Sequence, residues 1–198
     1  ALCEEVIALS SQALTEGDTA LAVKVAPLDS EIDHKEREIE NLCLKLLLRQ
    51  QPVARDLRQI SAALKMITDM ERIGDQAEDI AEIVAFLDGR QAENDALLKE
   101  MAKAVIQMVT ESVDAYVKCD IMLAKKVIAA DDVVDEQFAR VKQSLIGKIA
   151  ADPADGEYAL DLLMIAKYYE RIGDHATNIA EWVIYSVTGT HKDEITLT

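Results

Sequence analysis

The sequence Glu71-Arg-Ile-Gly-Asp75 occurs a second time as Glu170-Arg-Ile-Gly-Asp174, at an offset of 99 residues. When each copy is extended by seven residues, nine of the twelve aligned positions are identical. The chain has 198 residues, so this offset is half of its length. The repetition indicates an internal duplication, and therefore a fold built from two similar halves.

The composition favours a helical globular protein. Half of the residues are hydrophobic and 29% are charged, whereas aromatic residues make up only 4%, with seven glycines and three prolines. Chains dominated by Ala, Leu, Ile, Val, Glu and Lys are typical of helix-rich folds. We therefore predict an all-α protein with a lobe at residues 1–89 and a second lobe at residues 90–198.

The charge excludes several classes of partner. With 37 acidic and 21 basic residues, the net charge is −16, which would repel nucleic acids and anionic lipid surfaces and favour cations. Cys3, Cys43 and Cys119 are widely spaced, so we expect neither a disulfide framework nor a zinc-thiolate site, and a reducing cytoplasm fits best. No apolar run approaches the roughly 18 residues of a membrane-spanning helix. No nucleophile or phosphate-loop motif is visible, so we expect no enzyme activity.

The sequence pattern of each half predicts three helices. Gly17-Asp18 reads as a helix stop followed by an N-cap, and Pro27 is expected to kink the second helix. The predicted ranges are about 2–14, 18–49 and 52–88 in the first half, and 91–118, 120–150 and 154–187 in the second. The first helix is about a dozen residues shorter than its counterpart, so its beginning is expected to be missing. Each lobe is thus predicted to be a three-helix bundle.

Apolar stripes predict which helix faces are buried. The second helix is expected to bury Val25, Leu28, Ile32, Ile39, Leu42 and Leu46. The third is expected to bury Ile73, Ala77, Ile80, Val84 and Leu87.

Paired carboxylates are the most informative polar feature. Residues four apart share a helix face, so each copy of the repeated sequence presents a Glu and an Asp side by side. Each preceding helix carries a further pair, and these match at an offset of 102 residues: Asp29 and Asp33, then Asp131 and Asp135. Antiparallel neighbours in a bundle can bring the two pairs of a lobe face to face.

Two interpretations of these pairs stay open. Four clustered carboxylates are unfavourable without a cation, and all-oxygen ligands suit Mg²⁺, Ca²⁺, Mn²⁺ or ferric iron. One metal site per lobe, on the bundle surface, is therefore the first hypothesis. The second is a solvated acidic face, which the same spacing would also produce.

Three other features qualify these hypotheses. Gly74 and Gly173 are costly inside helices, which indicates that something approaches the backbone closely there. Glu31 and His34 have the Glu-x-x-His spacing of di-iron bundles, but the second half has no copy. His175 is not repeated either, and we expect it to be a surface histidine.

The sequence resembles the PhoU family of accessory proteins of bacterial high-affinity phosphate uptake. The resemblance covers essentially the whole chain and rests on the repeated Glu-Arg-Ile-Gly-Asp, the four aspartates and the stretch Gln51-Pro-Val-Ala-Arg-Asp-Leu-Arg58. It implies two tandem three-helix bundles related by pseudo-two-fold symmetry. It also implies surface metal clusters, with iron and multinuclear sites known in the family, although another hard divalent cation would suit the same ligands.

Carried over by position, the resemblance implies two ligand sets. These are Asp29, Asp33, Glu71 and Asp75 in the first lobe, and Asp131, Asp135, Glu170 and Asp174 in the second. Asp79 and Asn178 are further candidate ligands, and the absence of an acid at Asn178 argues against equal occupancy of the two sites.

The resemblance also implies a function. Members of the family are negative regulators of the phosphate-starvation response, scaffolds that link the phosphate transporter ATPase to a sensor histidine kinase. A cytoplasmic homodimer, peripheral to the inner membrane at most, is expected. An accessory protein of a low-affinity phosphate permease is the nearest alternative, and a carboxylate-bridged metal storage or redox protein is the second.

Overall fold

The computed structural model describes residues 1–87 and 96–190, and this part of the chain contains helices and no strand. The helices are α1 (Leu2–Glu16), α2 (Thr19–Ala22), α3 (Val25–Gln50), α4 (Arg55–Phe86), α5 (Ala96–Lys118), α6 (Ile121–Ala151), a short 3₁₀ helix η1 (Pro153–Asp155) and α7 (Gly156–Thr188). The predicted class, two tandem three-helix bundles, is confirmed. The lobe boundary predicted at residues 89 and 90 lies outside the described residues.

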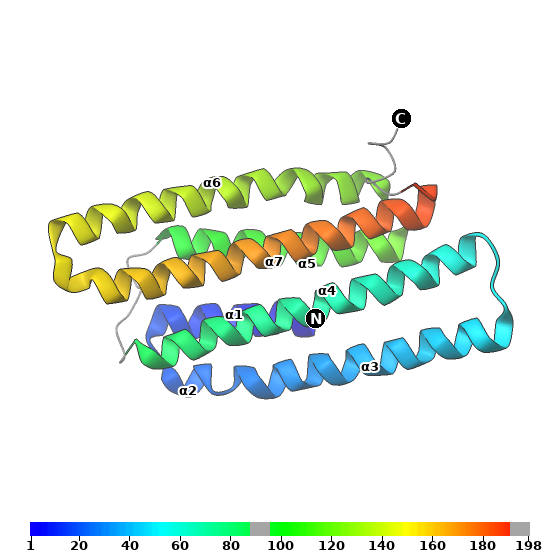
Figure 1. The fold of residues 1–198 in the computed structure, drawn as a ribbon, viewed down its shortest axis with the longest axis horizontal. Helices are drawn as coiled ribbons and strands as arrows, with labels where there is room; N and C mark the ends of the chain where they lie inside the picture. Colours follow the sequence, from blue (N-terminus) through cyan, green and yellow to red (C-terminus); the bar gives the residue numbers. More distant parts are fainter. Residues whose placement is uncertain (88–95, 191–198) are drawn as a thin grey trace.

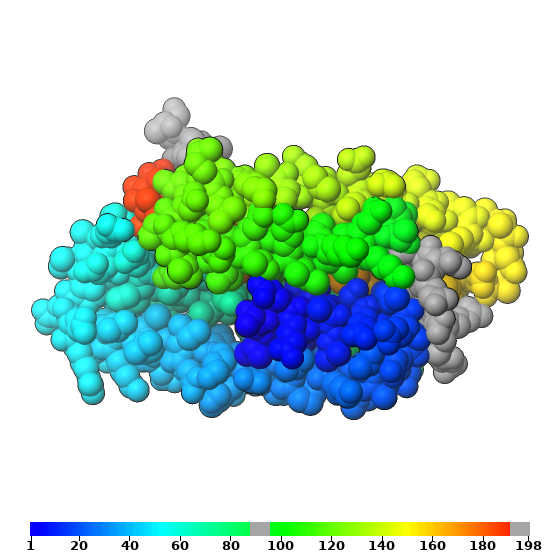
Figure 2. All heavy atoms as spheres, turned by 180° about the vertical axis from the view of Figure 1, so that it is seen from behind, coloured from blue at the N-terminus to red at the C-terminus, as the bar shows by residue number. Residues whose placement is uncertain are grey.

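The two bundles lie side by side along their length (Figure 1). The first lobe consists of α1 to α4 and the second of α5 to α7. The most extensive contact between any two helices joins α4 to α7, which run in opposite directions through the middle of the molecule. On the other side, α1 lies against α5 (Figure 2). Within the described residues, no helix has both the length and the apolar character needed to cross a membrane.

Local signals set the helix ends in the same way in both lobes. Gly17 ends α1 in the left-handed conformation, with φ 63°, which a residue without Cβ adopts at little cost. Asp18 then caps α2, because its side chain accepts hydrogen bonds from the backbone N–H groups of Ala20 and Leu21. Asp120 caps α6 in the same way. These features confirm the predicted stop and N-cap.

The second helix is interrupted rather than kinked, so the prediction of one helix from residue 18 to residue 49 is wrong. The chain turns at Val23 and Lys24 before α3 begins. Pro27 has no N–H to donate to the carbonyl four residues earlier, that of Val23. The corresponding residue of the second lobe is Ala129, and there α6 continues without a break.

The repeated sequence supplies the centre of the core. Four apolar positions of α4 and their counterparts in α7 are at most 1% exposed: Ile73, Ala77, Ile80, Val84, Ile172, Ala176, Ile179 and Val183. They belong to one apolar cluster that extends through both lobes. The stripe predicted for the third helix is confirmed, including Leu87, which is 4% exposed.

The stripe predicted for the second helix is only partly correct. Val25 and Ile32 are buried, whereas Ile39 is 38% exposed and Leu42 is 55% exposed. With 15 residues, α1 is too short to cover all 26 residues of α3. The far half of α3 therefore lacks the third helix that would bury those side chains.

Candidate metal centre

The acid pairs of the first lobe meet where α3 packs against α4. One carboxylate oxygen from each of Asp29, Asp33 and Asp75 lies within 4.8 Å of the other two. Burial and the negative charges of Asp75 and Asp33 raise the pKa of the Glu71 carboxyl. The structure thus groups three of the four predicted ligands of this lobe, Asp29, Asp33 and Asp75, with Glu71 on the turn of α4 before Asp75.

The second lobe repeats the arrangement more loosely. Burial, followed by the charges of Asp174 and Asp135, raises the pKa of Asp131 to about 6. Asp135 and Asp174 are exposed side chains. Among the described residues, no trio of carboxylates in this lobe is as tightly grouped as the trio around Asp29.

Asp29 is the buried member of the first cluster, with 7% of its surface exposed. Its Oδ1 atom is shielded from solvent and has no hydrogen-bond partner in the described part of the chain. Burial and the charges of Glu78, Asp75 and Asp33 raise its pKa to about 7. A buried carboxylate without a partner is costly, and a bound cation would remove that cost.

A second oxygen in this cluster is also left unsatisfied. Glu71 Oε2 is shielded and lacks a hydrogen bond, although Arg72 Nε lies 3.4 Å away. Two unsatisfied carboxylate oxygens beside two further carboxylates form a set of hard oxygen donors. The residues present therefore fit a hard cation.

Gly74 provides the space that lets α3 approach α4. A Cβ atom on Gly74 would overlap Asp29 Oδ1 and lie 3.1 Å from Ile32 Cδ1. At Gly173 the corresponding distance, to Asp131 Oδ1, is an ordinary 3.5 Å. The predicted close approach is confirmed at Gly74, and the neighbouring helix causes it.

Glu78 is a member of the cluster that sequence reasoning missed. Its carboxyl group lies near that of Asp29, and the charge of Glu78 is among the causes that raise the pKa of Asp29. Glu71, Asp75 and Glu78 follow one another at spacings of four and three residues, which places them on one helix face. That spacing is the sequence signal for Glu78. The acid is not repeated, because the aligned residue of the second half is Thr177.

The additional candidate ligands lie at the contact between the lobes. Asn178 Nδ2 donates to Asp69 Oδ1 at 3.2 Å, across the crossing of α4 and α7. Asp79 also lies at this contact, because it lines a hollow together with Arg171 and His175 of the other lobe. Whether Asp79 and Asn178 bind metal stays a prediction.

The expectation for His175 is wrong. Its side chain is only 22% exposed, and its Nδ1 atom lies 2.9 Å from Asp69 Oδ1 of the other lobe. His34, by contrast, is 68% exposed and pairs with Glu38 at 3.3 Å. The Glu31 and His34 spacing therefore lies on the outer face of α3 and not in the core.

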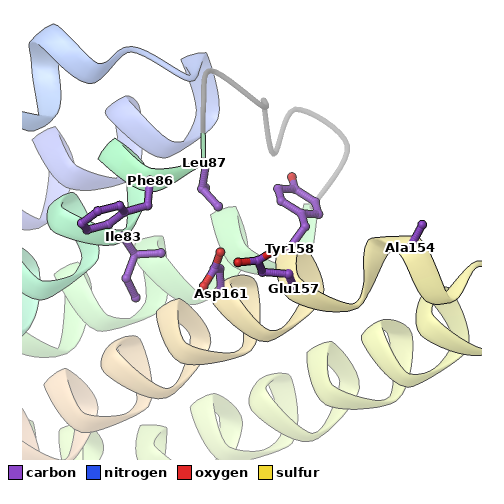
Figure 3. A pocket seen from close by; sticks show the side chains of 7 residues that line it. All are labelled: Ile83, Phe86, Leu87, Ala154, Glu157, Tyr158 and Asp161. Atoms are coloured by element: carbon purple, nitrogen blue, oxygen red, sulfur yellow. The ribbon is translucent and has the colours of Figure 1, made fainter.

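A hollow of about 500 Å³ lies elsewhere, between the end of α4 and the start of α7 (Figure 3). Its lining includes apolar side chains and two carboxylates, those of Glu157 and Asp161. The other lining residues are Ile83, Phe86, Leu87, Ala154 and Tyr158. None of the predicted ligands lines it, so it is not part of the candidate metal centre.

Comparison with known proteins identifies the family of the chain. The family model of the PhoU domain matches twice, at residues 1–84 and 98–183. The chain belongs to the PhoU family. A Pseudomonas aeruginosa protein described as a phosphate-specific transport system accessory protein PhoU homolog is 36% identical over all of this chain and 82% of its own length. A Clostridium acetobutylicum protein with the same description is 37% identical over 92% of this chain and 84% of its own length.

Solved PhoU structures have the same fold. The crystal structure of PhoU from Pseudomonas aeruginosa superposes with a TM-score of 0.90 at 36% identity, over 96% of this chain and 91% of that one. The crystal structure of the phosphate transport system regulatory protein PhoU from Streptococcus pneumoniae gives 0.87 at 25% identity, over 96% and 90%. The family's pairing of two bundles is therefore present in this chain.

We expect the two repeated glycines to respond differently to alanine. Gly74→Ala should lower the free energy of unfolding by roughly 1–3 kcal/mol, because the new methyl group overpacks the contact with Asp29 and Ile32. Gly173→Ala is the matched control and should leave stability unchanged or raise it by up to about 1 kcal/mol through better helix propensity. Urea unfolding measures both, and equal effects would contradict this account of Gly74.

The pKa of Asp29 predicts how stability depends on pH when cations are removed with a chelator. The pKa is about 7 in the folded chain, against 3.8 without the fold, so the folded state binds more protons between these values. Stability should therefore fall as pH rises from about 4 to about 7 and then level off. Asp29→Asn cannot ionise and should weaken this dependence in urea unfolding curves. An unchanged slope in the variant would count against the shift.

Proposed function

We propose that this protein is an accessory protein of phosphate transport and a negative regulator of the phosphate-starvation response. In this proposal it acts in the cytoplasm, as a homodimer, and couples the high-affinity phosphate transporter to a sensor histidine kinase. Relatives described as accessory and regulatory proteins of phosphate transport support the link to the transporter. The link to the kinase rests on the family resemblance.

The observation that carries the biochemical part of the proposal is the buried, unpartnered carboxylate of Asp29 among other carboxylates. We infer a cation site in each lobe, held by the acid pairs of α3 and α4 and of α6 and α7. Iron, in a multinuclear cluster, or another hard divalent cation fits these oxygen donors. The bound cation would offset the repulsion between the paired helices.

The carboxylates would also have a mechanical role. Each site joins two helices of one bundle, so occupancy would hold the acidic outer surfaces of α3 and α4 in a fixed relation. A rigid surface loses less conformational freedom when a partner binds it. Cation binding would thereby favour docking on transporter and kinase domains.

The regulatory proposal predicts a phenotype. A strain that lacks the gene should express a reporter of phosphate scavenging in high phosphate, and the intact gene should restore repression. Repression that persists without the gene would contradict the proposal. Association of the purified protein with the ATPase of the high-affinity transporter, compared with a low-affinity permease, would identify which transporter it serves.

The cation proposal predicts metal in the purified protein under metal-replete conditions. Asp75→Ala combined with Asp174→Ala removes one ligand from each lobe and should abolish most of the bound metal, as measured by elemental analysis. The control, Glu40→Ala with Glu136→Ala, changes exposed acids on α3 and α6 and should keep the metal. A metal-free parent, or a double variant that retains its metal, would favour the solvated acidic face.

A further inference from the structure

The duplication has diverged around the acid pairs, and the differences concern the residues that face each cluster. Aligned positions beside the acid pairs change charge from the first lobe to the second: Glu36 becomes Phe138, Thr68 becomes Lys167, Glu78 becomes Thr177, and Ser30 becomes Asp132. The first three changes make the second cluster less anionic, whereas Asp132 adds an exposed acid whose charge acts on Asp131.

Lys167 already provides a positive charge in the second lobe. Its ammonium group forms an ion pair with Glu170 and also lies 5.6 Å from the centre of the Phe138 ring. A cation arriving at Glu170 would have to displace this ammonium group. Thr68, at the aligned position of the first lobe, carries no charge.

The first lobe has additional negative charge in place of that ammonium group. Glu36 is among the carboxylates whose charges act on Glu71, and Glu78 faces Asp29. In the second lobe, the Thr177 hydroxyl faces Asp131 without completing an ordinary hydrogen bond. A hydroxyl group is a neutral and weaker ligand for a hard cation than a carboxylate.

The shielded carboxylate oxygens without a hydrogen bond differ between the lobes, although shielded oxygens of other groups, such as Thr177 Oγ1, also lack a partner in the second lobe. In the described residues, the carboxylate oxygens left without a hydrogen bond are Asp29 Oδ1 and Glu71 Oε2, and both belong to the first lobe. The four acids of the second lobe contribute none. A bound cation would therefore remove a larger cost of unpaired, shielded carboxylate oxygens in the first cluster than in the second.

Two arginines partly offset the charge of the first cluster. Arg37 lies 3.5 Å from Asp33, and Arg72 lies 2.8 Å from Asp75. Their side chains are 70% and 56% exposed, against 44% for Lys167, which also lies over the Phe138 ring, so both arginines can turn into solvent at less cost than Lys167. Neither arginine contacts Asp29 or Glu78 in the ion pairs of the described chain.

We propose that the site in the first lobe is the high-affinity cation site of this protein, with Glu78 as a fifth carboxylate ligand. The site in the second lobe is weaker because Lys167 and Thr177 occupy the corresponding positions. This inference rests on the proposed binding of cations at the acid pairs. The cation is a hard divalent or trivalent ion, for which affinity rises with the number of charged oxygen ligands.

Two single-site proteins test this inference, with Mn²⁺ as the probe. Asp131→Asn with Asp174→Asn leaves only the first site, and Asp29→Asn with Asp75→Asn leaves only the second. After treatment with a chelator, free Mn²⁺ is followed by electron paramagnetic resonance during titration. The first-site protein should bind Mn²⁺ at least about tenfold more tightly, a difference of roughly 1.4 kcal/mol.

Exchanging the divergent residues should transfer the affinity. Glu78→Thr in the first-site protein should weaken binding about tenfold, whereas Thr177→Glu with Lys167→Thr in the second-site protein should strengthen it by a similar factor. Glu82→Thr in the first-site protein is the matched control, because it removes the same charge from an exposed position one turn further along α4. Circular dichroism of each chelator-treated variant verifies that it is folded.

The outcomes separate this inference from the proposal on which it rests. If neither single-site protein binds more Mn²⁺ than a protein with all four Asn substitutions, cation binding at the acid pairs is overturned. If both bind with equal affinity, or if Glu78→Thr has no more effect than Glu82→Thr, only the inference about the first lobe is overturned.

Discussion

The close contact of α3 with α4 at Gly74 is the constraint on which the site of the first lobe depends. Helices bury apolar surface most fully when their backbones approach closely, and Gly74 allows this where any side chain would collide with Asp29. The same contact forces carboxylates of both helices together. The packing that stabilises the bundle thus places carboxylates close together at its edge, where they repel one another. A bound cation would offset this repulsion.

Much of the fold could be predicted from the sequence because the relevant signals are local. The burial of Ile73 and Ile80 follows from helical periodicity, and the cap at Asp18 follows from residue chemistry at a helix start. The acid pairs of the first lobe could be placed face to face for the same reason. Each of these features needs only the spacing within one helix and the order of the helices.

The features that sequence reasoning missed depend on distant contacts. His175 contacts Asp69, a residue 106 positions away, and no spacing within one helix predicts that pair. The burial of Asp29 depends on how closely α3 approaches Gly74, which is a property of the packed bundle. The internal repeat indicates the paired acids as candidate ligands. It does not indicate Glu78, because the aligned residue of the second half is a threonine.

Because the two lobes share one apolar cluster, each lobe depends on the other for the burial of its core. Because α4 and α7 make the most extensive helix contact and lie in the middle of the molecule, each half shields the other's long central helix from water. A half on its own would leave this face of its central helix exposed unless a second copy or another partner covered it. Duplication in one chain makes that association permanent, independent of protein concentration, and leaves each copy able to change its acid cluster separately.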